Sequence, residues 1–292
     1  MLTTIQNDRL VVTADTRGAE LQSIEAKGGL SYLWTGTPPY WSYRAPTLFP
    51  IIGALRDGHA WSAGGEITLP KHGFCRQAEF AIESAEDTAV TYRLTDSEAT
   101  RKGYPYSFTL RIRYELEGDG VTTRYIVKNE GNQDMPFFVG GHPAFRIPLE
   151  EGETLEDYRV EFAQPETADC PMVDLTAGLI LDTERNRFLT DRATFALNHV
   201  LFRGDALIFD ELKSRRVRLY SAKSGHGVRM DFEGMQYLAI WSPANDSPFV
   251  CLEPWTGMAT CASEDDIFEH KRGVTVLEPG AETSFAFTVT VF

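Results

Sequence analysis

Alternation of apolar and polar residues with a period of two runs through most of this chain, and it limits the possible folds more than any other feature. In the segment 108–114, Phe108, Leu110, Ile112 and Tyr114 alternate with polar residues. A β-strand with this pattern buries one face and leaves the other face wetter. The same alternation, or enrichment in β-branched and aromatic residues, marks the segments 10–15, 78–87, 89–96, 106–120, 121–132, 215–225, 226–234, 235–243 and 282–292. These segments predict strands along most of the chain.

Helical patterns are confined to two short segments, 96–104 and 263–273. Turns rich in Gly, Asn and Asp separate the predicted strands, and no Pro/Ser/Gly-rich linker divides the chain. The region 150–200 is less regular, and we expect it to be a long excursion with short elements. The sequence therefore predicts an all-β fold with few short helices. We expect a single domain over residues 1–292, built from large antiparallel sheets that pack on each other.

The acidic composition narrows the classes of function. A formal net charge of −14 argues against a nucleic-acid partner, which requires a basic face. No stretch reaches the roughly 18 apolar residues of a membrane span, so we expect no membrane partner. The four cysteines show no C-x-x-C spacing, and we expect reduced thiols in a cytoplasmic protein. The sequence does not specify an oligomeric state.

Three short strings combine one ionisable side chain with glycines, prolines and aromatic residues. They are KHGFCR around His72, VGGHPAF around His142 and VCLEPWTG around Glu253. His72 has two equally good interpretations, a turn histidine or a histidine presented to a ligand. His142 and Glu253 lie in runs that are otherwise apolar, where an ionisable group is costly unless it has a partner or a task. Two histidines and one glutamate are sufficient to move protons on a small polar substrate.

Five further side chains are candidates for substrate binding, each with a structural alternative. Arg44 and Arg76 either form ion pairs at strand edges or grip hydroxyls or an anion. Arg56 fits a polar hairpin turn, and Asp205 fits a turn or cap carboxylate. Trp255 is a core aromatic by default, but a Trp face beside a polar site also packs against sugar rings.

Other chemistries fit the sequence less well. His72, His142 and Glu253 have the types of a two-histidine, one-carboxylate zinc site, but no pair has the short spacing of an HExxH motif, so we expect no metal. Motifs of serine hydrolases, nucleotide hydrolases and dinucleotide-dependent enzymes are missing. A glycosidase could use Glu253 with Asp205, but both histidines would then have no role.

The strings APTLFPIIG, LPKHGFCR, FFVGGHPAFRIPL, GDALIF and FVCLEPWTG, in this order from residue 45 to 257, resemble the aldose 1-epimerase family. Among its members the chain looks closest to the LacX-like branch. The resemblance implies a β-supersandwich fold and interconversion of the α and β anomers of an aldose, without a metal or organic cofactor. The implied partner is therefore a small-molecule sugar substrate.

The resemblance also implies roles for individual residues. Glu253 matches the catalytic base, His142 the catalytic acid, and His72 the histidine that positions and polarises the sugar. Asp205 matches an aspartate that binds sugar hydroxyls, and Arg56 falls near an arginine that contacts the substrate.

One departure concerns the substrate. Galactose mutarotases carry Asn-x-x-His-Gly-Gly at the first histidine, whereas this chain has LPKHGFCR. The HGF-x-R pattern is shared with hexose-6-phosphate epimerases, in which arginines matching Arg76 and Arg44 lie near the phosphate. We expect a free hexose to be the substrate. The alternatives are a hexose 6-phosphate and a non-catalytic carbohydrate-binding protein on the same fold.

Overall fold

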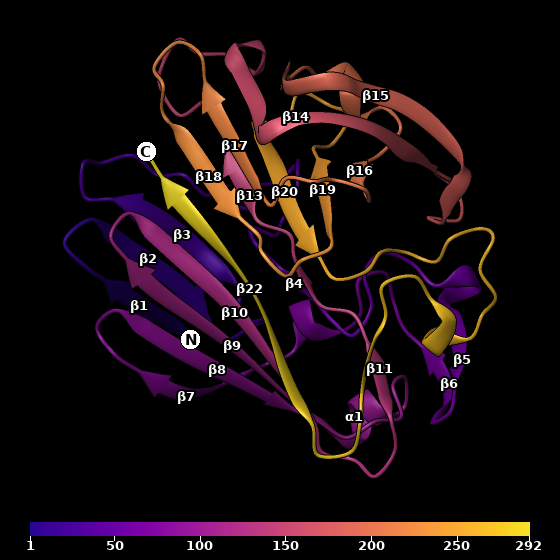
Figure 1. Ribbon diagram of the computed structural model, residues 1–292. Helices are drawn as coiled ribbons and strands as arrows, with labels where there is room; N and C mark the ends of the chain where they lie inside the picture. The colour runs from indigo at the N-terminus through magenta and orange to yellow at the C-terminus, as the bar shows by residue number, and fades with distance from the viewer.

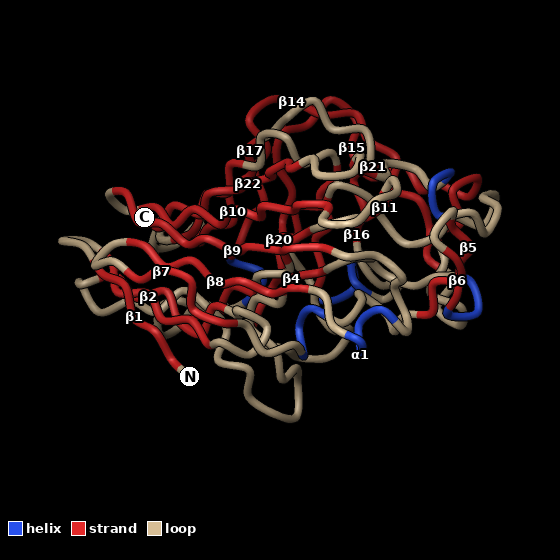
Figure 2. The backbone as a smooth tube through the Cα atoms, turned by 90° about the horizontal axis from the view of Figure 1, so that it is seen from below, coloured by secondary structure: helices blue, strands red, loops and turns tan.

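Antiparallel sheets dominate the structure, a computed structural model that describes residues 1–292. Strands contain 50% of the residues and helical segments 7%, which confirms the predicted all-β class (Figures 1 and 2). The largest sheet has nine strands in the order β15-β14-β17-β18-β22-β10-β9-β8-β7. Their bounds are Ala81–Ala85 for β7, Ala89–Thr95 for β8, Phe108–Glu117 for β9, Gly120–Asn129 for β10, Tyr158–Val173 for β14, Ile180–Ala196 for β15, Arg216–Ser221 for β17, Gly227–Asp231 for β18 and Glu282–Val291 for β22.

A six-stranded sheet carries the motif residues. Its main path runs β16-β19-β20-β12-β4, and β13 pairs with β20 beside β12. The bounds are Thr47–Leu48 for β4, Gly140–Gly141 for β12, Ala144–Arg146 for β13, Leu207–Phe209 for β16, Tyr237–Trp241 for β19 and Phe249–Trp255 for β20. All seven residues of β20 are buried, because both faces of this strand are covered. Burial on both faces explains why its sequence is an almost continuous apolar run.

The remaining elements are small. One sheet has three strands in the order β1-β2-β3, and β11 with β21 and β5 with β6 form two-stranded pairs. The strand bounds are Leu2–Gln6 for β1, Leu10–Asp15 for β2, Leu21–Ala26 for β3, His59–Ser62 for β5, Gly65–Thr68 for β6, Met135–Phe137 for β11 and Thr275–Leu277 for β21. The helical segments are α1 at Glu98–Arg101 and the single turns Arg56–Gly58, Cys75–Gln77, Leu155–Asp157, His199–Phe202 and Phe268–His270. None of them is long and apolar enough to cross a membrane.

A cluster of 73 buried hydrophobic residues, from Ile5 to Val291, draws on the strands of all the larger sheets. It includes tyrosines whose hydroxyls bond to the backbone, as Tyr114 does to the carbonyl of Ala19 at 2.7 Å. All four cysteines are free and buried. The core therefore joins segments that lie far apart in the sequence.

The expectation of short elements in the region 150–200 was wrong. This region forms the two longest strands of the molecule, β14 and β15, which pair as an irregular antiparallel hairpin. Three register shifts between Glu161 and Asp169, and a fourth after Pro171, interrupt the ladder, and these irregularities disguise the period of two in the sequence. Figure 1 shows the hairpin curving past β16, with its far end at the right of the view.

Candidate active site

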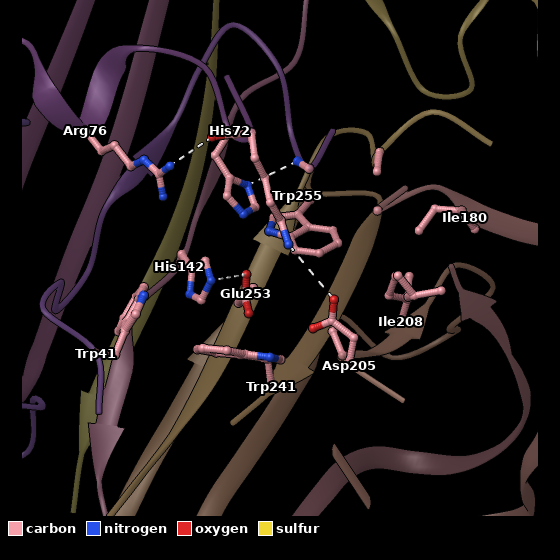
Figure 3. A pocket seen from close by; sticks show the side chains of 16 residues that line it. Trp41, His72, Arg76, His142, Ile180, Asp205, Ile208, Trp241, Glu253 and Trp255 are labelled. Carbon is pink, nitrogen blue, oxygen red and sulfur yellow. Dashed lines mark hydrogen bonds and ion pairs between the residues drawn. The ribbon is translucent and has the colours of Figure 1, made fainter. Parts of the chain in front are cut away.

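A cavity of about 330 Å³ opens beside β20, and it gathers residues from widely separated segments (Figure 3). Its lining consists of Trp41, Gly53, Lys71, His72, Arg76, His142, Val173, Gly178, Ile180, Asp205, Ala206, Ile208, Trp241, Glu253, Trp255 and Ala259. Six of the eight predicted site residues are among them. The three motif strings therefore meet in one place.

Glu253 is held by the most buried strand of the site. It lies on β20 opposite Ala239 of β19, and only 2% of its surface is exposed. Burial raises the pKa of the Glu253 carboxyl well above its usual value. The negative charge of Asp205 raises this pKa further, whereas Lys71 opposes the rise. Glu253 can therefore hold a proton near neutral pH, as a general acid–base group must.

His142 faces Glu253 from the link between β12 and β13. Its backbone N–H donates to the carbonyl of Pro46 at 3.2 Å, and Pro143 follows it, so the backbone here is held on both sides. The Nε2 atom lies 3.2 Å from Glu253 Oε2, close enough for the two groups to share a proton. Its other ring nitrogen, Nδ1, is buried and has no partner.

Burial acts on His142 in the direction opposite to its effect on Glu253. It lowers the pKa of the imidazole to about 3, and the positive charges of Lys71 and Arg76 lower it as well. Burial therefore favours the uncharged form of both groups. At this separation the two groups titrate as a coupled pair.

His72 has a defined tautomer. The backbone N–H of Gly53 donates to His72 Nδ1 at 3.1 Å, so Nδ1 is the acceptor and the ring proton sits on Nε2. Burial is the main cause that lowers the pKa of His72 well below its usual value, so the ring is neutral. The His72 backbone has a φ of 70°, in the left-handed region, and its own N–H donates to the Gly53 carbonyl at 2.8 Å. His72 thus offers the cavity a fixed, uncharged N–H donor.

Charged groups line one wall of the cavity. Lys71 Nζ lies 4.0 Å from Asp205 Oδ2, and Asp205 occupies a turn with a φ of 76°. Arg76 donates to the Lys71 carbonyl at 3.0 Å, and its guanidinium lies 5.0 Å from the centre of the Tyr43 ring. The Arg76 Nε is buried without a partner. These groups are placed to meet the oxygens of a polar ligand.

Arg44 and Arg56 do not line the cavity. The Arg56 guanidinium donates to Asp266 at 3.0 Å and to three backbone carbonyls between 261 and 264, so it fastens that loop. The Arg44 guanidinium lies against Gly36, where an added Cβ would come within 3.1 Å of it. Partners within the chain therefore hold the Arg56 cation, and the Arg44 guanidinium packs beside Gly36 outside the cavity lining, which the sequence pattern alone does not reveal.

Aromatic and aliphatic side chains complete the cavity. Trp255 and Trp241 come from β20 and β19, and Trp41 comes from the loop before β4. The Trp255 Nε1 is buried without a partner. On the opposite side Val173 and Ile180 reach the cavity from the β14–β15 hairpin. The ligand site therefore has a charged wall and an apolar wall.

Sequence reasoning missed several lining residues. Lys71 was visible as the neighbour of His72 in the KHGFCR string, but only the histidine and Arg76 stood out. Trp241 reads as a core aromatic, and Trp41 precedes the first motif without a distinctive spacing. Nothing in the sequence indicated Val173 and Ile180, because the hairpin that carries them was not predicted.

The side chains that lie close enough to hold a metal ion differ from the set of two histidines and one glutamate considered in the sequence analysis. Ligand atoms of His142, Cys251 and Glu253 lie within 4.8 Å of one another, whereas His72 does not belong to the group. A thiol has to lose its proton to bind a metal ion. Burial raises the pKa of Cys251 well above its usual value, which disfavours the thiolate. The chemistry of this cluster therefore favours proton transfer over metal binding.

Comparisons with known proteins give a consistent result. The family model described as aldose 1-epimerase matches residues 1–289. The plasmid-encoded protein LacX of Lactococcus lactis subsp. lactis is 39% identical over 293 residues, which cover 98% of each chain. A crystal structure from Lactobacillus acidophilus, described as a galactose mutarotase related enzyme, superimposes with a TM-score of 0.95 at 32% identity and covers 100% of this chain and 97% of that one. A galactose mutarotase-like protein from Lactobacillus casei gives a TM-score of 0.89 at 28% identity, with 100% of both chains covered.

Proposed function

The chain belongs to the aldose 1-epimerase family, and on this premise we propose that it interconverts the α and β anomers of a free hexose. The observation that carries the proposal is the buried pair of Glu253 and His142, whose side chains lie 3.2 Å apart at the cavity. Anomers interconvert through the open-chain aldehyde. That reaction needs one group to accept a proton and another to donate one at the same time.

The proton balance of the pair matches this reaction. With the ring closed, the Glu253 carboxylate removes the proton of the anomeric hydroxyl while the His142 imidazolium protonates the ring oxygen. The bond between the anomeric carbon and the ring oxygen breaks, and the aldehyde forms. Both groups are then neutral, which is the state that burial favours in the sugar-free protein.

Ring closure reverses the transfers. Rotation about the bond between C1 and C2 presents the other face of the aldehyde. His142 then takes the proton of the attacking hydroxyl, and Glu253 returns its proton to the carbonyl oxygen. His72 Nε2–H and the carboxylate of Asp205 would hold the sugar oxygens while the aldehyde turns. The pair ends in its starting state, so no other proton carrier is required.

Substitution of the base tests the proposal. Glu253→Gln keeps the shape of the side chain but cannot accept a proton, so anomer exchange should fall by about 100- to 10,000-fold. Sugar binding should persist, because the interaction is lost in the transition state rather than in the ground state. Exchange spectroscopy by NMR on glucose and galactose measures the rate.

The exposed Glu233 provides a matched control, and Glu233→Gln should retain full activity. Near-normal exchange in Glu253→Gln would contradict the assignment of the base. Sugar binding by the wild type without any anomer exchange would favour the non-catalytic carbohydrate-binding alternative.

A hexose 6-phosphate is the second candidate substrate, and the cations Lys71 and Arg76 on the cavity wall are the observation that favours it. The free hexose remains preferred because Lys71 already faces Asp205, and because Arg44 is not part of the cavity lining.

The test compares the specificity constants for glucose and glucose 6-phosphate in the wild type, Lys71→Ala and Arg76→Ala. We expect the wild type to prefer the free sugar. A preference for the phosphate of more than about tenfold, equivalent to about 1.4 kcal/mol, that either substitution erases would establish the second candidate.

A further inference from the structure

The closed-ring step requires an imidazolium at His142, yet most of its surroundings disfavour that charge. Burial and the cations Lys71 and Arg76 all lower the pKa of this imidazole. His72 lies beside it, with ring centres 5.8 Å apart, and is neutral. A contact with the backbone of His142 itself acts in the opposite direction and raises this pKa in part, although the buried Nδ1 has no partner in hydrogen-bond geometry. Other groups in the site therefore have to stabilise the imidazolium against burial and the two cations.

Negative charge near His142 comes mainly from one carboxylate, Glu253, with Asp205 beyond it. The thiol of Cys251 also lies close, but burial keeps it protonated. Glu253 becomes neutral in the same step in which His142 gives up its proton, so the carboxylate and the imidazolium are present together while the ring is closed. A neutral, electron-rich group beside the imidazole would add to the attraction of Glu253 for the imidazolium without competing for its proton.

The indole of Trp41 has the position of such a partner. Its ring centre lies 4.7 Å from that of His142, and the two ring planes are tilted by 32° (Figure 3). A cation within about 6 Å of a Trp ring centre is attracted by the negative face of the ring. Trp241 also contacts His142, at 5.5 Å and 89°, in an edge arrangement.

The surrounding loop fixes the Trp41 ring. Its carbonyl accepts a hydrogen bond of 2.9 Å from Trp34 Nε1, and its ring stacks at 5.8 Å and 24° on Phe249. Phe249 begins β20, the strand that carries Glu253. The same strand thus anchors both the base and the ring that covers the acid.

We infer that Trp41 is a positioning residue of this active site, whose indole face stabilises the positively charged form of His142 while the sugar ring is closed. The inference rests on the proposed epimerase reaction and adds a residue to it. An alternative role for Trp41 is a stacking platform for the sugar, because it also lines the cavity. The two roles differ in the kinetic parameter that changes.

The first test reduces the electron density on the indole face of Trp41 in steps. Tryptophans are replaced biosynthetically by 5-fluoro- and 5,7-difluorotryptophan, which withdraw electron density and keep the ring shape nearly unchanged. The value of kcat should fall stepwise with the number of fluorines, while KM stays within about twofold. Trp41→Phe should lower kcat by about 3- to 10-fold and remove most of the fluorine dependence, because Phe is a weaker partner for cations.

Trp61 provides the matched control, since 49% of its surface is exposed and it is not part of the cavity lining. Trp61→Phe should keep the wild-type kcat and the full fluorine dependence. A rise in KM with unchanged kcat in Trp41→Phe would assign Trp41 to sugar stacking and overturn the inference. The same fluorine dependence in Trp41→Phe as in the wild type would also overturn it.

A second measurement needs no turnover and separates this inference from the proposed reaction. The imidazole ¹⁵N signals of His142 are titrated in the sugar-free protein. Protonation of His142 should occur at lower pH in Trp41→Phe, and at lower pH again in Trp41→Leu, than in the wild type and in Trp61→Phe. An unchanged titration overturns the role of Trp41. A shifted titration in a protein that exchanges no anomers supports the contact between Trp41 and the imidazolium, and it contradicts the epimerase proposal instead.

Discussion

Glu153 and Glu253 are both buried carboxylates, and their surroundings shift their pKa values in opposite directions. For Glu253 the charge of Lys71 only partly opposes burial, and the pKa rises. Burial also acts to raise the pKa of Glu153, but hydrogen bonds from Ser221 and Tyr158 together outweigh it and hold the value at about 2. Hydrogen-bond donors therefore decide whether a buried carboxylate stabilises the fold or carries a mobile proton.

Glu153 should stabilise the protein in a way that depends on pH. Its pKa in the folded state is about 2, below the usual value of 4.5, so its contribution is fully present above about 4.5 and is lost as the pH falls toward 2. Glu153→Gln should lower the free energy of unfolding by about 1.5–3 kcal/mol at pH 7, the usual range for hydrogen bonds to a charged group. Urea unfolding between pH 7 and pH 3 measures the difference, which should shrink at the acidic end.

Glu151 is the control for this experiment, because it is exposed and lies in the same turn. Glu151→Gln should change the stability by less than about 0.5 kcal/mol at either pH. A stability loss in Glu153→Gln that is the same at pH 7 and pH 3 would show that the charge of Glu153 contributes nothing.

At the scale of elements, the segment 69–77 shows how close backbone packing places a side chain at the cavity. Gly73 has a φ of 73° and pairs with Phe49 in a parallel bridge. A Cβ atom at this glycine would lie 2.1 Å from the Phe49 carbonyl oxygen. The glycine in the KHGFCR string is therefore required by the approach of two backbones, and that approach holds His72 beside the cavity.

Gly73→Ala should lower the free energy of unfolding by at least about 2 kcal/mol, since both strain and a backbone clash oppose it. Any folded fraction should also lose activity, because the clash displaces His72. Gly28→Ala is the matched control. Its added Cβ meets no atom within 4 Å, so the change in stability should stay within about 0.5 kcal/mol. Thermal unfolding and anomer exchange of both variants check the prediction, and equal stability of the two would refute it.

The sequence predicted elements well where the physical signal is local. Alternation in 10–15 coincides with β2 at Leu10–Asp15, and the apolar run around Glu253 coincides with the fully buried β20. The sequence pattern did not reveal β14 and β15, because four register shifts remove the regular alternation there. Pairing over such irregular strands depends on tertiary contacts that no local pattern encodes.

At the scale of the whole molecule, residues far apart in sequence form the site because the core joins the sheets that carry them. His142 and Glu253 were recognisable because ionisable groups in apolar surroundings are costly unless used, whereas the residues around His72 left two equal interpretations. Arg44 and Arg56 could not be separated from Arg76 in this way. All three are long cationic side chains, and the sequence around them does not distinguish them. In the fold Arg56 binds Asp266, Arg44 packs beside Gly36, and Arg76 lines the cavity.

The β14–β15 hairpin supplies Val173, Gly178 and Ile180 to the cavity, whereas the groups proposed to move protons come from other segments. Its tip can therefore change in length or composition without disturbing His142 or Glu253. The lining thus separates into the proposed reaction centre and a wall that one hairpin supplies. Substitutions confined to this hairpin should change which ligand fits the cavity more than they change the proposed proton transfers.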